Sequence, residues 1–332
     1  MAVTIEDIKK LRTMTGAGMK DCKKALAEAN GDIDKAVELV RERGLAIAAK
    51  RSDRETSNGC VLVKNDNGFA AMIALKCETD FVANGADYIQ LTQEILDAAV
   101  AAKAQSLEQV KELTLADGTK ISEAVVRRSG VVGEKMELDG YLVLEGDNVY
   151  TYDHMGRHTL CTLVQLTAAN EDAGHKVAMQ VAAMKPVALD EASVSQEVKD
   201  SELKVAVEKT KEEQIERQVN VALKKAGINA NLVDSEDHIA SNVAKGWLTQ
   251  EDAEKAKAIK AEVSETAAAS LNEGMIQNIA KGRMAKFFKE NCLVDQEFQF
   301  GDGDKQSVSQ WLDKQAKGLK VVAYKRFSLS AD

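Results

Sequence analysis

The scarcity of proline constrains the fold of this chain more than any other feature of its sequence. Pro186 is the single proline among 332 residues, so the residue that most strongly breaks helices is almost absent. Alanine, glutamate, lysine and leucine, which favour helices, are abundant. Short apolar runs beside Asn-Gly and Gly-Asp-Asn turns interrupt this helical background. The sequence therefore predicts an α+β protein that is mostly helical and contains smaller β units.

Length, charge and hydropathy narrow the class of protein further. A chain of 332 residues is long enough for two or three domains. A formal net charge of −9 without an arginine-rich block argues against direct nucleic-acid binding. No apolar run approaches the roughly 20 residues that span a membrane, and the first residues lack a secretory signal pattern. We expect a cytoplasmic protein with neither a nucleic-acid nor a membrane partner.

The cysteines suggest neither a disulfide framework nor a metal site. They are five in number, widely scattered and without a C-x-x-C pair. Three lie among apolar residues of predicted strands or a helix, which is typical of small core side chains. We predict no cofactor. The cysteines are Cys22, Cys60, Cys77, Cys161 and Cys292.

Three short helical patterns fill the N-terminal 44 residues and predict a compact bundle. Thr4 and Asp7 have the spacing of a capping box at the start of the first pattern. Residues 13–18 separate it from the second, Asp32 can cap the third, and Gly44 is expected to end the third. The alanine-rich, basic segment that follows predicts a helical linker.

The glycine-rich turn at residues 16–20 superficially matches a phosphate-binding loop. That motif requires Ser or Thr after the lysine and a preceding strand, whereas here Asp21 follows Lys20 and a helix precedes. A turn between helices is therefore the better interpretation.

A β-hairpin followed by a helix is predicted next. Residues 59–64 and 69–77 are strand-like, and the Asn-Gly turn between them is the strongest short-range hairpin signal. Thr79 and Asp80 can cap a following helix. Phe81 is unusual at such a junction, because a large aromatic ring must either fold into the core or stand out toward a partner.

The same order of elements is predicted a second time. Residues 141–144, 149–152 and 159–166 are strand-like, and Thr-Ala-Ala-Asn at residues 167–170 leads into a helix. This order predicts two related α+β subdomains. Small residues suffice at the second strand-to-helix turn, which favours a special task for Phe81 in the first.

The segment after Pro186 has the pattern of long amphipathic helices with a narrow apolar stripe. Asp190 can cap a helix that runs to about Lys225, and a shorter helix follows at residues 235–245. Thr249 opens another helix, so an antiparallel helical hairpin is predicted. A short helix at residues 307–316 and a closing edge strand at residues 319–329 complete the chain.

Two motifs carry a resemblance to a known family. Residues 15–32 read Thr-Gly-Ala-Gly-Met-Lys-Asp-Cys-Lys-Lys-Ala-Leu-Ala-Glu-Ala-Asn-Gly-Asp, and residues 79–84 read Thr-Asp-Phe-Val-Ala-Asn. Together they resemble the bacterial elongation factor Ts family, from Thr4 to about Leu329. The resemblance implies an N-terminal three-helix bundle like ubiquitin-associated domains, two core subdomains and a helical, coiled-coil-like insertion. The implied divisions are 1–54 for the bundle and linker, 55–140 for core subdomain N, 141–187 plus 283–332 for core subdomain C, and 188–282 for the insertion.

The resemblance also implies a function. Members of the family are guanine nucleotide exchange factors for the GTPase elongation factor Tu, act by binding without covalent chemistry, and are not enzymes. Phe81 would be a wedge near the magnesium and phosphate site of the GTPase, and Asp80 would fix its entry. Both the GDP-bound and the nucleotide-free GTPase would be partners. The implied partner contacts are Thr79, Asp80, Phe81, Val82, Leu11, Met19, Leu138 and His154.

Some family motifs are altered in this chain. Where the family has Gly-Glu-Asn-Ile-x-x-Arg-Arg, residues 133–140 keep the apolar Met136 and Leu138 but lack both arginines. Where it has His-x-Gly-Gly-Arg-Ile, residues 154–159 keep His154 and shift the arginine. The helical extension that follows the last strand in some members is not expected here. The insertion is longer than is typical, so a homodimer through it and a solvated helical pair without a partner are both open.

Two other classes of function compete with exchange. The bundle could be a module that binds ubiquitin-like or peptide ligands, in which case the bundle alone would bind. An enzyme could pair Cys77 with a base, but no pattern places a histidine near a cysteine and no catalytic signature occurs. The histidines are His154, His158, His175 and His238.

Overall fold

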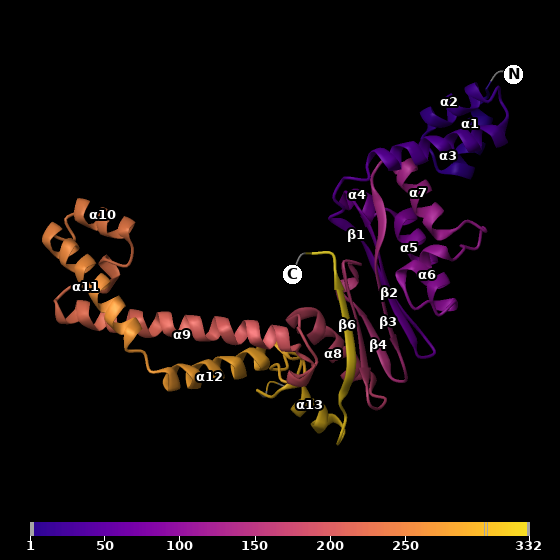
Figure 1. The fold of residues 1–332 in the computed structure, drawn as a ribbon. Helices are drawn as coiled ribbons and strands as arrows, with labels where there is room; N and C mark the ends of the chain where they lie inside the picture. Colours follow the sequence, from indigo (N-terminus) through magenta and orange to yellow (C-terminus); the bar gives the residue numbers. More distant parts are fainter. Residues whose placement is uncertain (1–2, 302, 304, 331–332) are drawn as a thin grey trace. The chain divides into compact units, whose positions relative to one another are not determined.

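A computed structural model describes residues 3–301, 303 and 305–330 of the chain. They divide into two compact units, which Figure 1 shows as a ribbon with labelled elements. The first unit comprises Met1–Leu189 and Glu297–Asp332, and the second comprises Asp190–Gln296. The mixture of helices with two antiparallel three-stranded sheets confirms the predicted α+β class.

The N-terminal part of the first unit is a bundle of three helices, α1 (Ile5–Thr15), α2 (Met19–Glu28) and α3 (Ile33–Lys50). Thr4 forms the predicted capping box at α1, and the Asp32 side chain caps α3. The buried side chains that hold the bundle together include Leu11, Cys22, Leu26 and Ala36. The predicted likeness to ubiquitin-associated domains stays a prediction.

The expectation that Gly44 ends the third helix is wrong, because α3 continues through it to Lys50. Gly44 lies against Gly130 of α7 (Ile121–Val132), and a Cβ placed on Gly130 would be 2.1 Å from the Cα of Gly44. Glycine therefore serves the close packing of two helices here, and that packing outweighs its low helix propensity. The first part of the predicted linker is a continuation of α3.

The first sheet has the order β1 (Asn58–Asp66), β2 (Phe69–Cys77), β3 (Met136–Glu145), with antiparallel pairing throughout. Asn67 and Gly68 both have positive φ, 49° and 85°, as an Asn-Gly hairpin turn requires. The predicted hairpin is therefore confirmed. One face of this sheet packs on α5 (Ala86–Ala101), α6 (Leu107–Glu112) and α7, with a continuous apolar core between them.

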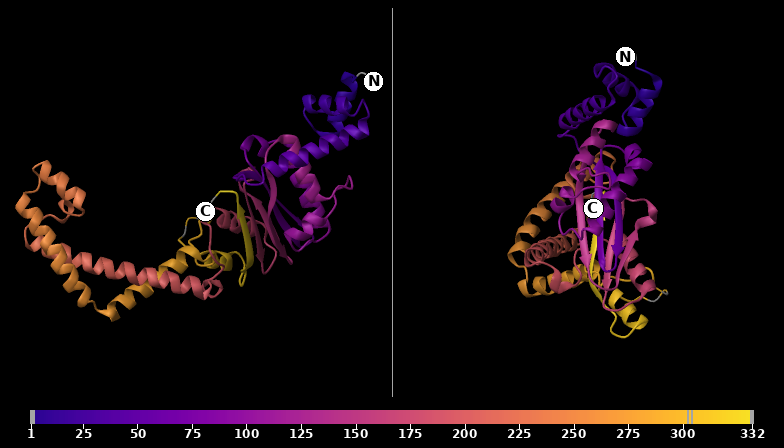
Figure 2. Two further views of the ribbon diagram at one scale, coloured as in Figure 1. Left: turned by 45° about the horizontal axis from the view of Figure 1, so that its top comes forward. Right: turned by 90° about the vertical axis from the view of Figure 1, so that its right-hand side faces the viewer.

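The second sheet has the order β4 (Val149–Asp153), β5 (Leu160–Leu166), β6 (Val321–Ser328). Helix α8 (Glu171–Met184) packs on its outer face, and α13 (Val308–Gln315) packs on α8. The inner faces of the two sheets share a second apolar core that includes Met72, Leu144 and Leu163. Helices, sheet, sheet and helices thus form successive layers of the first unit (Figures 1 and 2).

One strand belongs to a different sheet than the sequence indicated. Residues 141–144, predicted to open the second α+β subdomain, lie in β3 and pair with β2, with Leu142 opposite Met72. The turn at Gly146 leads from one sheet to the other and does not close a hairpin. A local apolar run shows that a strand exists, but its pairing partner is set by contacts far away in the sequence. The predicted edge strand near the end of the chain is confirmed as β6.

The second unit contains α9 (Gln196–Lys225), α10 (Glu236–Ala244), α11 (Gln250–Ala269) and α12 (Glu273–Asn291). Helix α9 packs against both α11 and α12, and Leu223, Val233 and Ala256 are buried in a small core of its own. Asp190, the predicted cap of the long helix, caps a short turn at Glu191–Ser193, and Ser195 caps α9. Thr249 caps α11 as predicted.

Within the described part of the chain, no helix combines the length and the hydropathy needed to cross a membrane. All five cysteines are free and buried, which confirms the predicted core placement of three of them and extends it to the other two.

Candidate functional site

The turn after β2 carries the residue that the sequence analysis singled out. It forms α4 (Asp80–Ala83), a single helical turn whose N-cap is Thr79. Ala83 is buried and Val82 packs against the first core, so these two side chains anchor the turn. Phe81 lies on the opposite side and is 88% exposed, the highest value among the large apolar side chains of the described residues. Of the two placements open to this ring, the structure shows the outward one.

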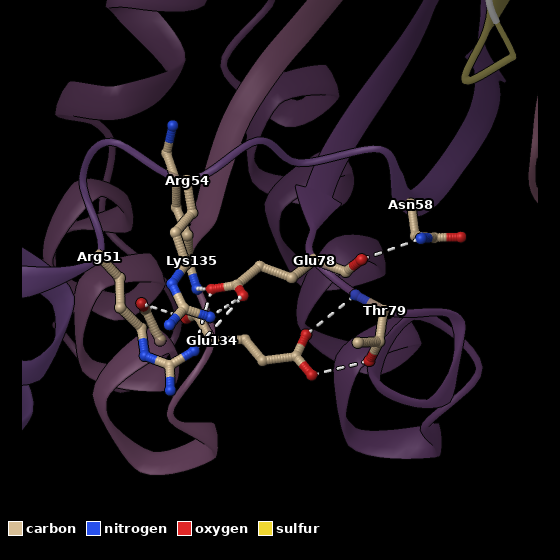
Figure 3. Close-up of polar contacts among 8 residues, drawn as sticks. Arg51, Arg54, Asn58, Glu78, Thr79, Glu134 and Lys135 are labelled. Atoms are coloured by element: carbon tan, nitrogen blue, oxygen red, sulfur yellow. Dashed lines mark hydrogen bonds and ion pairs between the residues drawn. The ribbon is translucent and has the colours of Figure 1, made fainter.

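The Thr79 cap is held by a glutamate from the turn that precedes the neighbouring strand β3. The Glu134 carboxylate accepts hydrogen bonds from the Thr79 backbone N–H at 3.1 Å and from Thr79 Oγ1 at 2.7 Å. The Thr79 hydroxyl in turn accepts from the Val82 N–H at 3.5 Å. Figure 3 shows Glu134 reaching across to Thr79. The first residues of α4 are therefore oriented by the side chain of Glu134 and not by backbone hydrogen bonds of the sheet.

A second carboxylate reaches in the other direction. Glu78 Oε1 accepts a hydrogen bond from the Lys135 N–H at 2.6 Å, and the Glu78 carbonyl accepts one from Asn58 Nδ2 at 3.0 Å. Arg51 and Arg54, which follow α3, place their Nη1 atoms 3.1 Å and 2.9 Å from the same carboxylate (Figure 3). The Glu78 side chain is only 14% exposed.

These contacts determine the charge of Glu78. The hydrogen bond from the Lys135 N–H, followed by the Arg54 and Arg51 guanidiniums, lowers the pKa of Glu78 from 4.5 to about 2. Glu78 is therefore a carboxylate at any pH near neutrality.

The turn that supplies Glu134 and Lys135 is itself fixed. Gly133 ends α7 with φ of 78°, a conformation that favours glycine. Ser129 Oγ donates a hydrogen bond to the Glu134 carbonyl at 2.5 Å. Both sides of the Glu134–Thr79 contact therefore rest on ordered elements.

A second exposed feature lies between β4 and β5. Met155 has φ of 57° and an exposed side chain, next to the half-buried His154, whose Nδ1 lies 3.2 Å from Tyr152 Oη. The His158 carbonyl accepts a hydrogen bond from the Val61 N–H at 2.7 Å, which ties this loop to β1. Val61 is three residues from Asn58, which pairs with the end of β2, so the loop lies about 10 Å along β1 from the Phe81 end.

The predicted contact residues differ in burial, and Thr79, Val82 and His154 are half-buried. Asp80, Phe81 and Met19, the first residue of α2, are exposed. Leu11 is fully buried inside the bundle. Leu138 lies in β3, and its side chain is buried in the core between the first sheet and the helices. The structure thus brings Thr79, Asp80, Phe81 and Val82 together and keeps Leu11 and Leu138 beneath the surface.

Sequence reasoning missed the residues that hold the turn. Glu134 is 55 positions from Thr79, so no local pattern joins them. Glu78 directly precedes the cap, and an acidic residue there was a signal that could have been followed. The backbone strain at Met155 has no sequence signal that we recognise.

The described residues near the turn favour recognition over covalent chemistry. The thiol of buried Cys77 donates to the Thr79 carbonyl at 3.2 Å, and burial raises the pKa of Cys77, which disfavours the reactive thiolate. No group of three or more metal-ligating side chains occurs among the residues that the structure describes. An exposed aromatic ring and an exposed carboxylate on a held turn are the chemistry of a binding surface.

Comparisons with known proteins agree with this class. A family model described as Elongation factor TS matches residues 78–235 and 205–331. Proteins named Elongation factor Ts from Phocaeicola vulgatus and Bacteroides fragilis are 58% and 59% identical over 332 and 333 residues, covering 100% of both chains in each case. One from Porphyromonas gingivalis is 41% identical over 336 residues, again with 100% of both chains covered.

These matches define the chain as a translation elongation factor. It belongs to the elongation factor Ts family, as the motifs at residues 15–32 and 79–84 predicted.

Proposed function

We propose that this protein is the guanine nucleotide exchange factor for elongation factor Tu. It binds the GDP-bound GTPase, inserts Asp80 and Phe81 near the magnesium and phosphate site, and promotes GDP release so that GTP can rebind during translation elongation. The observation that carries the proposal is the 88% exposure of Phe81 on a turn held from both sides. Such a role places the protein in the cytoplasm, where translation occurs.

The proposed mechanism follows from linkage. A GTPase holds GDP through backbone groups around the phosphates and a magnesium ion. A partner shifts this equilibrium only by its differential affinity for the nucleotide-free and nucleotide-bound states. A wedge that fits only after the phosphate-binding elements have moved has this differential affinity, and no covalent step is required.

The magnitudes are consistent with this surface. Acceleration of GDP release by three decades requires about 4 kcal/mol of coupling. Full burial of a phenylalanine side chain contributes about 1.5–3 kcal/mol, so Phe81 supplies a large part but not all of it. Further contacts from Asp80, Met19 and His154 supply the rest, while Leu11 and Leu138 shape the contact surface from beneath.

Stopped-flow release of a fluorescent GDP analogue from elongation factor Tu tests the proposal. The wild-type protein should accelerate release strongly, and Phe81→Ala should reduce the maximal rate about 10- to 100-fold, as loss of the burial energy predicts. Val221→Ala is the matched control, since Val221 is an exposed apolar residue of α9 in the second unit. It should behave as the wild type.

Two outcomes would count against the proposal in different ways. Release at the spontaneous rate with the wild-type protein would refute the exchange function. Equal acceleration by the wild type and Phe81→Ala would leave the function in place and remove Phe81 as the wedge.

A further inference from the structure

We propose that Glu134 and Glu78 are positioning residues that hold Phe81 in the orientation needed for nucleotide release. They form a reciprocal pair of hydrogen bonds, here called the carboxylate clasp, between residues 78–79 and residues 134–135. This inference rests on the proposed function and deepens it, because it concerns two residues to which the sequence analysis gave no role.

The clasp begins where the sheet ends. The last backbone pair between β2 and β3 is Cys77 with Met136. The next two residues on each strand no longer face each other as a ladder, because the chain turns into α4. The Thr79 and Lys135 N–H groups are instead bound by the carboxylates of Glu134 and Glu78. Side chains thus satisfy two backbone donors that would otherwise lose their partners.

A single helical turn needs such support. An isolated turn of four residues is unstable, because nucleation fixes several dihedral angles for one hydrogen bond. Glu134 takes both donors of Thr79, and the Thr79 hydroxyl oxygen then accepts from the Val82 N–H. This fixes the direction in which Phe81 leaves the turn. A ring fixed before binding loses less conformational freedom in the complex.

The clasp also reaches the N-terminal bundle. Arg51 is the C-cap residue of α3, and Arg51 and Arg54 both bind the Glu78 carboxylate that accepts the Lys135 N–H. The Glu78 carboxylate therefore links the end of α3 and the turn before β3 to the segment that leads into α4. A shift of α3 would displace Glu78 and, with it, the start of the turn that carries Phe81.

An ordinary surface ion pair would contribute little and have no effect on Phe81. Lys64–Asp97 is such a pair, with its atoms 2.7 Å apart and both side chains well exposed. Asp97→Ala is therefore a matched control for truncation of a carboxylate in the same unit.

The decisive experiment is a double-mutant cycle in the GDP-release assay with full-length protein. Glu134→Ala should lower the maximal release rate about tenfold, the loss expected for one charge-assisted hydrogen bond. The concentration of factor at half-maximal rate should change by less than about twofold, because most of the contact surface is retained. In the Phe81→Ala background, Glu134→Ala should have no further effect. Asp97→Ala should match the wild type in both backgrounds.

Hydrogen–deuterium exchange gives a readout that does not depend on elongation factor Tu. Glu134→Ala should speed amide exchange in residues 79–84 and leave exchange in residues 86–101 unchanged. If the wild type fails to accelerate GDP release, the proposed function is wrong, and this exchange pattern still decides whether the clasp holds the turn.

Other results would overturn the clasp as a positioning device. Equal losses of maximal release rate from Glu134→Ala in both Phe81 backgrounds would show that Glu134 does not act through Phe81. Unchanged amide exchange in residues 79–84 would show that Glu134 does not hold the turn. Should Glu134→Ala fail to fold, Thr79→Val removes the hydroxyl arm alone and should lower the maximal rate. Thr79→Ser restores the hydroxyl and should recover it; a Thr79→Val variant as fast as Thr79→Ser would equally refute the inference.

Discussion

The crossing of α3 and α7 makes an asymmetric prediction about two glycines. A Cβ on Gly130 would lie 2.1 Å from the Cα of Gly44 and 2.5 Å from its carbonyl carbon and oxygen. A Cβ on Gly44 would lie 3.5 Å from the Cα of Gly130, which is ordinary van der Waals contact. Both residues are inside helices, so alanine improves helix propensity equally at either position.

The two substitutions should therefore differ in sign. Gly130→Ala forces the helices apart by more than about 1 Å, and overpacking of this kind costs about 1–3 kcal/mol. A gain of about 1 kcal/mol in helix propensity offsets part of that cost, which leaves a net destabilisation of up to about 2 kcal/mol. Gly44→Ala meets no backbone clash and should stabilise the protein by up to about 1 kcal/mol.

Urea unfolding of both variants beside the wild type measures this difference. Gly130→Ala should also expose the segment after α3 to limited proteolysis, since α3 is held against the core by this crossing. Equal unfolding midpoints for Gly44→Ala and Gly130→Ala would refute the reasoning, as would a Gly130→Ala variant more stable than the wild type.

Three further predictions concern charge, burial and exposure. The pKa of Glu78 is lowered from 4.5 to about 2, so its carboxylate stabilises the folded state above pH 4.5 and loses this effect as the pH falls toward 2. This pKa shift corresponds to about 3 kcal/mol of folding free energy, which screening at exposed Arg54 reduces to about 1–2 kcal/mol. Glu78→Gln should lower the free energy of unfolding by that much at neutral pH and by progressively less as the pH falls. A loss that does not depend on pH would contradict the lowered pKa of Glu78. All five cysteines are buried, and burial raises the pKa of Cys60 to about 12, so a thiol reagent should modify the native chain at least about tenfold more slowly than the unfolded chain; equal rates would contradict the core placement. Leu11→Ala should lower the free energy of unfolding by about 2–4 kcal/mol. Met19→Ala should change it by less than about 0.5 kcal/mol and raise the concentration of this protein needed for half-maximal GDP release. Thermal unfolding and the release assay measure both effects, and a destabilised Met19→Ala beside an unaffected Leu11→Ala would contradict the placement of the two side chains.

Local signals in the sequence predicted most of the elements. The capping box at Thr4, the cap at Thr249 and the Asn-Gly turn before Phe69 all lie where they were expected. These signals work because capping and hairpin turns involve residues close in sequence.

Features that depend on distant contacts were beyond reach. Glycine is the residue type that most often ends a helix, so Gly44 indicated a helix end. Its role in packing depends on Gly130 of α7, which is far away in the sequence. The strand at residues 141–144 was recognised, whereas its place beside β2 depends on pairing across more than 60 residues. In both cases tertiary packing overrode the local signal.

The candidate site shows the same division. Thr79 was recognised as a helix cap from its position. The resemblance of residues 79–84 to a family motif drew attention to Phe81. The outward placement of Phe81 follows from the anchoring of Val82 and Ala83 in the core, which only the fold reveals. Glu134 holds Thr79 through a side chain from a distant turn, so no pattern of spacing indicates it.

The proposed exchange function requires the protein to bind the nucleotide-free GTPase more tightly than the GDP-bound one, and calorimetric titration measures this difference. The affinity of the protein is measured for elongation factor Tu stripped of nucleotide and for the same GTPase saturated with GDP and magnesium. Exchange by differential binding predicts at least about a thousandfold tighter binding to the stripped form, or about 4 kcal/mol. Equal affinities for the two forms would contradict the account, because a partner that binds both states equally cannot promote GDP release.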